Sequence, residues 1–166
     1  VCGHGVGTAL LSISILNVLR ARSLTETNFY NPEDVLSALN VVFPMEKHKN
    51  MFFTIWYGVY NIKDRSMIYC SGGHPPALLM TGESRKSAEL QELTTGGMII
   101  GGMPDVTFSN KKIVVERFGE LFIFSDGAFE LKKTDGAMLR FEEFVTAVRG
   151  MTLEGTASVD NIVKFG

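Results

Sequence analysis

One segment near the middle of the chain constrains the fold more than any other. The run MFFTIWYGVY at residues 51–60 is rich in aromatic and β-branched residues, which favour strands. Turn-forming residues at 61–66 separate it from a second such run, MIYCSG, at residues 67–72. Two strands joined by so short a turn pair as an antiparallel hairpin. The glycines and prolines of Gly72-Gly73-His74-Pro75-Pro76 then predict a stiff loop after the hairpin.

Further short strands follow the hairpin, without the regular alternation of strand and helix that builds a parallel sheet. We expect these strands at residues 77–80, 90–93, 106–116 and 120–125. We expect helices at residues 8–22, 32–42, 141–149 and 156–165. The first helix is mostly apolar and should be buried, and Asn31 and Pro32 give the second a clear start signal. The pattern predicts an α+β fold in which helices cover antiparallel sheets.

Composition and charge exclude several classes of function. The chain has 166 residues, of which 45% are hydrophobic, enough for one globular domain with a sizeable core. Its net charge of -2 gives no broad basic field, so nucleic acid is a poor default partner. The two cysteines, Cys2 and Cys70, form no CxxC pair, which favours a reducing cytoplasm. No apolar run reaches the roughly 18–20 residues needed for a membrane span.

Asp126 is the strongest candidate for chemistry in the residues themselves. It follows the apolar run LFIF at residues 121–124 and precedes Gly127, so its carboxylate should emerge at a strand end. Carboxylates, carbonyls and water are the ligands that suit Mg²⁺ or Mn²⁺. The alternative interpretation is a turn aspartate that accepts backbone N–H bonds.

Two other segments are open to more than one interpretation. The turn Gly3-His4-Gly5-Val6-Gly7, which precedes a helix, could bind an anion on its backbone N–H groups, or it could be purely structural. His74, between two glycines and two prolines, could be a ligand, a proton donor or a loop anchor. Packing or capping is an equally good role for His4 and His74.

Taken in order, three motifs resemble the SpoIIE/RsbU branch of the metal-dependent protein phosphatases, the PPM superfamily. The first is an aspartate, two variable residues and Gly-His-Gly before a helix; Val1 to Gly5 fits, with the aspartate falling just before Val1. The second is the strand at 51–60, a turn, and a strand ending in Gly-His-Pro-Pro at 73–76. The third is a strand ending in Ser-Asp-Gly at 125–127. The resemblance covers almost the whole chain.

The resemblance implies an α/β/β/α sandwich, in which two antiparallel sheets are flanked by helices and the metal site lies at one end. It implies two Mn²⁺ or Mg²⁺ ions that activate a bridging water for in-line attack on a phosphorylated serine or threonine. Asp126 becomes the expected catalytic metal ligand, and the main-chain carbonyl of Val1 is expected to bind metal as well. Expected site-lining residues are Gly3, His4, Gly5, Gly73, His74 and Gly127.

The sequence departs from the family pattern at both ends. The first metal aspartate and the bridging aspartate of the family would precede Val1, and the last acidic motif would follow Gly166. Asp160 lies within a helical pattern, so we do not assign it as a ligand. Residues 1–166 are therefore expected to form a single phosphatase domain that lacks its N-terminal strands and C-terminal strand, with little activity by themselves.

The same resemblance implies partners. The family acts on phosphorylated anti-sigma-factor antagonists with a STAS fold, and its members are attached to sensor or receiver domains; a homodimer is possible. The main alternative is a noncatalytic module that keeps the fold and binds a signalling partner without hydrolysis. An anion or nucleotide binder that uses the turn at residues 3–7 is the third alternative, and it lacks a companion motif for ribose or phosphate.

Overall fold

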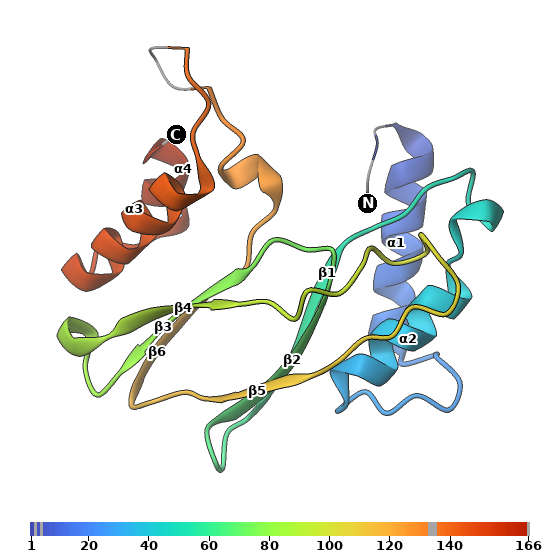
Figure 1. Cartoon of the computed structure of the whole chain (residues 1–166), viewed down its shortest axis with the longest axis horizontal. Helices are drawn as coiled ribbons and strands as arrows, with labels where there is room; N and C mark the ends of the chain where they lie inside the picture. Colours follow the sequence, from blue (N-terminus) through green and yellow to red (C-terminus); the bar gives the residue numbers. More distant parts are fainter. Residues whose placement is uncertain (2, 4, 133–135, 166) are drawn as a thin grey trace. The chain divides into compact units, whose positions relative to one another are not determined.

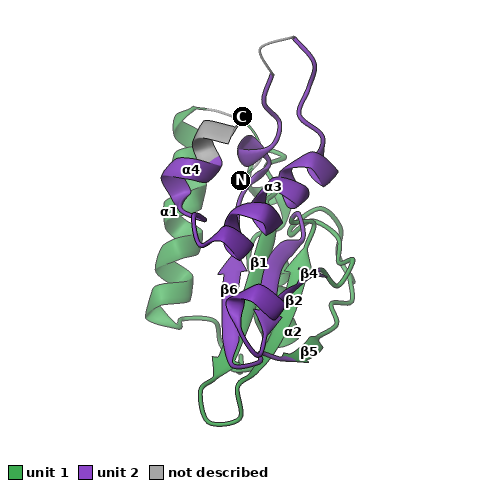
Figure 2. Cartoon of the chain, turned by 90° about the vertical axis from the view of Figure 1, so that its left-hand side faces the viewer, with its two compact units in different colours: residues 1–74, 94–113 green, residues 75–93, 114–166 purple. Residues whose placement is uncertain are grey.

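The structure is a computed structural model that describes residues 1, 3, 5–132 and 136–165. The chain forms two compact units (Figures 1 and 2). Unit 1 comprises residues 1–74 and 94–113, and unit 2 comprises residues 75–93 and 114–166. Each unit has its own three-stranded sheet, its own helices and its own hydrophobic core.

The sheet of unit 1 is built on the predicted hairpin. Strands β1 (Ile55–Asn61) and β2 (Ser66–Gly72) pair antiparallel, with Ile55 opposite Gly72 and Asn61 opposite Ser66. The short strand β5 (Lys111–Val114) completes the order β1-β2-β5. The central strand β2 is the most buried of the three, because it is covered along both edges.

Two helices cover one face of this sheet and form the core of unit 1. They are α1 (Val6–Ala21) and α2 (Pro32–Val42), and a short 3-10 helix, η1 (Met45–Lys47), follows. Helix α2 packs on β1 and β2. The buried residues of the core come from both helices, from β2 and from the loops: Leu11, Ile15, Leu24, Val35, Leu36, Leu39, Phe43, Phe53, Cys70, Ile100 and Phe108.

The first turn of α2 is capped from a distant part of the sequence. Asn31 precedes the helix as predicted, but its side chain makes no capping hydrogen bond. Instead, the Glu33 N–H donates to Oδ1 of Asn110 at 3.0 Å, and the Asn110 N–H donates to Oε2 of Glu33 at 3.1 Å. This reciprocal pair satisfies a free N–H of the helix and fixes the segment that leads into β5.

The sheet of unit 2 has the order β4-β3-β6. Strand β3 (Ala77–Gly82) is buried throughout and pairs antiparallel with β4 (Glu89–Leu93) and with β6 (Phe118–Phe122). The 3-10 helix η2 (Arg85–Ser87) connects β3 to β4. Thr81 ties the start of β6 to the centre of the sheet, because its hydroxyl donates to Phe118 O at 3.0 Å.

Helices α3 (Phe141–Glu154) and α4 (Val159–Phe165) belong to unit 2 and share a hydrophobic core with its sheet. Phe144 and Val148 of α3 are buried with Leu78 of β3 and Leu139, and Phe122 and Ile162 pack against this group. These contacts bury one face of α3 on the sheet. A third 3-10 helix, η3 (Asp126–Ala128), lies between β6 and α3 in the chain.

The predicted α+β class, with antiparallel sheets and helices, is confirmed. Three local predictions differ from the structure. The strand expected at 51–60 begins at Ile55, because Phe53 makes only a single bridge to Ile100. The strand expected at 106–116 is limited to β5. Helix α1 is not a buried helix, since it buries Leu11 and Ile15 but exposes Val6, Leu10, Ile13 and Leu16.

Among the residues that the structure describes, no helix is both long and apolar enough to cross a bilayer.

Candidate functional site

Asp126 presents its side chain from a closed turn. Strand β6 ends at Phe122, so Asp126 does not lie at a strand terminus as predicted but begins η3. Its carbonyl accepts hydrogen bonds from the N–H groups of Phe129 at 3.0 Å and Glu130 at 2.8 Å. Its Oδ1 accepts the Gly127 N–H at 2.9 Å, and the residue is exposed. The turn therefore fixes the backbone while the carboxylate faces solvent.

Four phenylalanines hold the two ends of this turn against α3. Phe124 precedes Asp126, Phe129 follows it, and Phe141 and Phe144 belong to α3. The ring of Phe124 makes an edge contact with Phe144 at a centroid distance of 4.8 Å, and Phe129 makes one with Phe141 at 5.2 Å. Edge contacts of this kind add to the energy of burying the rings. We call this group the phenylalanine cluster.

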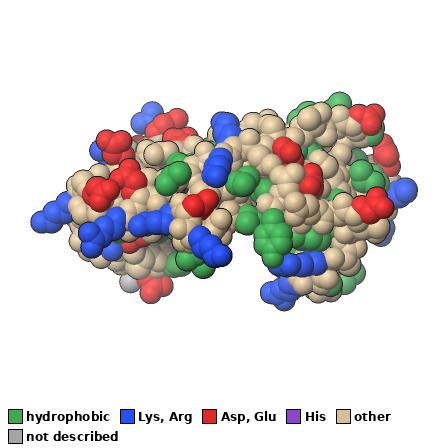
Figure 3. Space-filling view, turned by 90° about the horizontal axis from the view of Figure 1, so that it is seen from below, with side chains coloured by type: hydrophobic (Ala, Val, Ile, Leu, Met, Phe, Trp, Pro, Cys, Tyr) green, Lys and Arg blue, Asp and Glu red, His purple; other side chains and the backbone are tan. Residues whose placement is uncertain are grey.

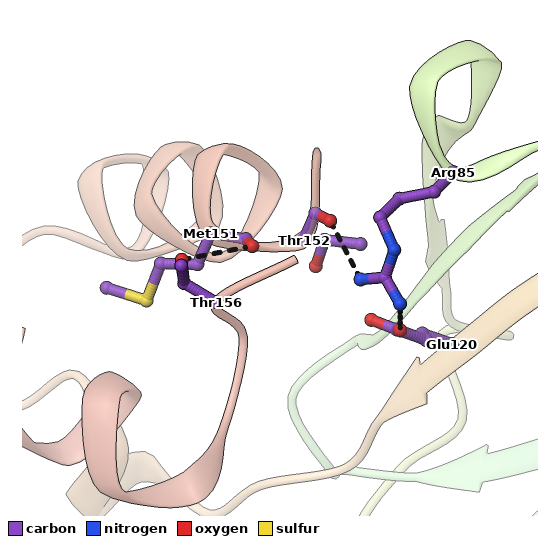
Figure 4. Close-up of polar contacts among 5 residues, drawn as sticks. All are labelled: Arg85, Glu120, Met151, Thr152 and Thr156. Carbon is purple, nitrogen blue, oxygen red and sulfur yellow. Dashed lines mark hydrogen bonds and ion pairs between the residues drawn. The ribbon is translucent and has the colours of Figure 1, made fainter. Parts of the chain in front are cut away.

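The far end of α3 is held by Arg85 (Figure 4). Its guanidinium donates to Thr152 O at 3.1 Å and forms an ion pair with Glu120 of β6 at 2.9 Å. It also lies 5.0 Å from the centroid of the Phe118 ring. A cation beside the last carbonyls of a helix complements the helix dipole. Helix α3, which carries half of the phenylalanine cluster, is thus held at its start by the segment that follows β6 and at its end by Arg85 and Glu120.

The glycine turn before α1 belongs to unit 1. Gly3 and Gly5 have φ values of 103° and 98°, which L-residues rarely adopt, so glycine is required at both positions. Gly5 is the N-cap of α1 and brings no side-chain cap, and the first turn holds no acidic residue. The free N–H groups and the helix dipole could therefore receive an anion. His4 lies outside the described residues.

The loop around His74 is built by close backbone approach. The Gly73 N–H donates to Gly97 O at 2.7 Å, and a Cβ on Gly97 would lie 2.1 Å from Ser71 O. Thr95 anchors the same contact, since its Oγ1 accepts the Ser71 N–H at 2.9 Å. The roles of Gly97 and Thr95 were not predicted, because Ser71 and Thr95 lie 24 positions apart and no local pattern marks the contact. His74 is half-buried in this loop.

Cys70 is not a candidate nucleophile. It is fully buried in the core of unit 1, and burial raises the pKa of its thiol, although a contact with Thr95 Oγ1 at 3.7 Å acts the other way. A thiol in this environment stays protonated at neutral pH and is inert.

The candidate residues divide between the two units. Asp126 and Gly127 lie in unit 2, whereas Val1, Gly3, Gly5, Gly73 and His74 lie in unit 1. Among the residues that the structure describes, no three His, Cys, Asp or Glu side chains gather as a metal-binding group. An exposed carboxylate on a rigid turn fits one coordination position of a hard cation. Asp126 can therefore contribute a metal ligand, but the described residues do not make a complete site.

The sequence of the chain matches a known protein family. The model of the family "Stage II sporulation protein E (SpoIIE)" matches residues 1–164. The chain belongs to the SpoIIE family.

Individual relatives agree with the family assignment. The chain is 29% identical over 140 residues to "Phosphoserine phosphatase RsbU" of Bacillus subtilis, an alignment that covers 84% of this chain and 40% of RsbU. It is also 29% identical over 83 residues to "Protein IcfG" of Synechocystis, covering 49% of this chain and 12% of IcfG. The chain therefore spans less than half the length of these curated relatives.

A solved structure shares the fold. The crystal structure of the RsbU and RsbW domains of Rv1364c from Mycobacterium tuberculosis superposes with a TM-score of 0.72 at 21% identity. The match covers 98% of this chain and 42% of the solved one. At this identity the likeness establishes the fold of the SpoIIE-family chain, and it confirms the predicted fold class.

Proposed function

We propose that this chain is the core of a single protein phosphatase domain that removes phosphate from phosphoserine or phosphothreonine on a signalling protein. The observation that carries the proposal is the exposed Asp126 carboxylate on a rigid turn, in a chain that matches the SpoIIE family over residues 1–164. The relative RsbU is named a phosphoserine phosphatase, which supports the same reaction here.

In this proposal Asp126 holds Mn²⁺ or Mg²⁺, together with the main-chain carbonyl of Val1 and acidic ligands that the described residues do not supply. Two such ions, when bound, supply a water of lowered pKa and offset the charge on the phosphoryl oxygens. Residues of this chain position the Asp126 carboxylate. The turn of η3 fixes the Asp126 backbone, and the phenylalanine cluster prevents that turn from shifting on α3.

The glycine turn takes the phosphoryl group in the same proposal. Gly3 and Gly5 leave the backbone open before α1, and the N–H groups of the first turn can donate to anionic oxygens. His4, Gly73, His74 and Gly127 line the site. None of these roles requires a protein nucleophile, which agrees with the burial of Cys70.

The proposed substrate is a phosphorylated anti-sigma-factor antagonist with a STAS fold. The occurrence of RsbU and RsbW domains in one relative, Rv1364c, supports a role in sigma-factor regulation. We further propose that the full-length protein carries a sensor or receiver domain, acts in the cytoplasm and can form a homodimer. The length of the curated relatives supports additional domains.

The decisive experiment is hydrolysis of p-nitrophenyl phosphate by the full-length protein, with and without Mn²⁺. Turnover should require the metal and should fall by more than about a hundredfold in Asp126→Asn, since even changes behind the ligands cost 10- to 100-fold. The matched control is Asp160→Asn, which changes an exposed aspartate on α4 and should leave turnover unchanged.

The same assay separates the main alternative. If the folded, metal-loaded protein shows no turnover, the noncatalytic signalling module becomes the better interpretation. If Asp126→Asn retains full turnover, the activity survives but the role assigned to Asp126 is wrong.

A further inference from the structure

A cavity of about 530 Å³ opens in unit 1 beside the turn between β1 and β2. It involves neither the glycine turn nor the His74 loop. Its volume lies in the range of ligand-binding pockets. Its main lining residues come from the loop before α2, from the hairpin and from β5: Tyr30, Val59, Ile62, Lys63, Ile68 and Lys112. We call this surface the hairpin groove.

The hairpin side of the groove is preformed. The Lys63 N–H donates to Oδ1 of Asn61 at 3.0 Å, which fixes the first part of the turn. Oδ1 of Asp64 accepts both the N–H and the hydroxyl of Ser66, at 3.0 and 2.8 Å. These bonds, first the hydroxyl and then the N–H, lower the pKa of Asp64. A groove whose wall is already ordered loses little entropy on binding.

The opposite side presents an aromatic ring that is also held in place. Tyr30 is 66% exposed, yet its N–H donates to Oδ1 of Asn28 at 3.0 Å. The guanidinium of Arg22 lies 5.5 Å from the centroid of its ring. Ile62, on the hairpin, is 81% exposed. A fixed, exposed tyrosine beside arginine and apolar side chains is the composition of an interface hot spot rather than of ordinary surface.

The charge of the groove is positive. Lys63 and Lys112 are exposed, and neither forms an ion pair with any residue that the structure describes. Asp64 is the acidic residue of the lining; its carboxylate stays ionised, and the charge of Lys112 also lowers its pKa, after the two bonds from Ser66. Two lysines against one aspartate leave the lining with an excess of positive charge. On the side toward which the β1–β2 turn points, hydrophobic side chains lie among Lys and Arg side chains and among Asp and Glu side chains (Figure 3). A complementary partner must carry negative charge next to apolar side chains.

We propose that the hairpin groove binds an acidic segment of a partner protein, in which carboxylates alternate with apolar side chains. The apolar side chains contact Tyr30, Val59, Ile62 and Ile68, and the carboxylates reach Lys63 and Lys112. The exposed apolar rim favours a protein segment over a small ligand, which would leave Tyr30 and Ile62 in water. The binding is independent of phosphatase activity and does not use Asp126.

The test is fluorescence anisotropy with the full-length protein and a fluorescein-labelled Glu-Leu-Glu-Phe-Glu-Leu peptide. The peptide should bind more tightly than its isostere with Gln at each Glu position, and added salt should weaken it. The double variant Lys63→Glu/Lys112→Glu should weaken binding by about tenfold or more, as two lost charge pairs imply. Tyr30→Ala should also weaken binding by about tenfold or more.

Lys86→Glu is the matched control, because Lys86 is exposed on η2 in unit 2 and forms no ion pair with a described residue. It should leave peptide affinity unchanged. Absence of binding, equal affinity for the Gln isostere, or equal losses from the lysine reversals and Lys86→Glu would each overturn the proposal. Self-association abolished by Tyr30→Ala, measured by sedimentation, would instead assign the groove to a second copy of the chain.

Discussion

Helices α1 and α3 each adjoin one part of the candidate site, but they are held in different ways. Helix α1 in unit 1 follows the glycine turn, buries only Leu11 and Ile15, and begins without a side-chain cap. Helix α3 in unit 2 buries Phe144, Val148 and Thr152, and the Arg140 N–H donates to Oε2 of Glu143 at its start. Arg85 holds its other end.

Under the proposed function, in which Asp126 binds metal and the glycine turn binds phosphate, this difference matches two demands on such a site. A metal ligand must stay within a narrow range of positions, and Asp126 is placed by a hydrogen-bonded turn that the phenylalanine cluster fixes to α3. An anion-binding backbone needs open N–H groups, and Gly3 and Gly5 place no side chain at two positions of the turn before α1. Helix α3, beside the Asp126 turn, is therefore more firmly packed than α1, beside the glycine turn.

The largest effect is expected from Phe144→Ala. Phe144 is 2% exposed and contacts both Phe124 and Phe129, so the change leaves a cavity at the base of the Asp126 turn. We expect a loss of about 3–5 kcal/mol in the free energy of unfolding. Chemical denaturation of the full-length protein would measure it, and Mn²⁺ affinity should fall at the same time.

Thr146→Ala is the control on the same helix, because Thr146 is exposed and its hydroxyl bonds only to Glu142 O. It should change the free energy of unfolding by no more than about 0.5 kcal/mol. If Phe144→Ala had the same small effect, the phenylalanine cluster would not be what holds the turn.

A second pair of substitutions tests the weaker packing of α1. Leu11 is 5% exposed, and Leu11→Ala should cost about 2 kcal/mol, the low end for a buried leucine, because few neighbours cover the helix. Leu16 is 49% exposed, and Leu16→Ala should cost no more than about 0.5 kcal/mol. Thermal unfolding would distinguish the two. Equal costs would mean that α1 is covered on its exposed face in solution.

Apart from the control substitutions, the smallest effect is expected from Arg85→Met, which keeps much of the apolar stem but removes the charge. The ion pair with Glu120 is partly exposed and contributes little, while the bond to Thr152 O is lost. We expect a loss of about 1 kcal/mol in the free energy of unfolding. Backbone amides in the last turn of α3 should exchange hydrogen faster than in the unmodified protein. Faster exchange at η3 alone would contradict this assignment.

The fold was largely predictable where local signals are strong. The Asn-Pro-Glu-Asp sequence predicted the start of α2 at Pro32, and the turn at residues 61–66 predicted the β1–β2 hairpin. Predictions failed where pairing with a distant segment decides whether a strand forms. Residues 51–54 have the composition of a strand, but Phe53 makes only a single bridge, to Ile100. Residues 106–110 form no strand, and Asn110 instead caps α2.

The candidate site shows the same division. The Ser-Asp-Gly motif identified Asp126 because the residues of the motif are adjacent in the sequence. The phenylalanine cluster and Arg85 were not predicted, because their partners are separated by long stretches of chain; Arg85 and Thr152 are 67 positions apart. Whether Asp126 binds metal stays a prediction.

The sequence by itself determined the place of the turn between β1 and β2, the start of α2 and the motifs of the SpoIIE family. These depend on backbone preferences and on residues within a few positions of one another. Only the tertiary structure decided that Asn110 caps α2, that Arg85 holds α3 and that four phenylalanines surround the Asp126 turn. Such contacts join distant segments, and their energy is gained only once both segments are placed in the folded core.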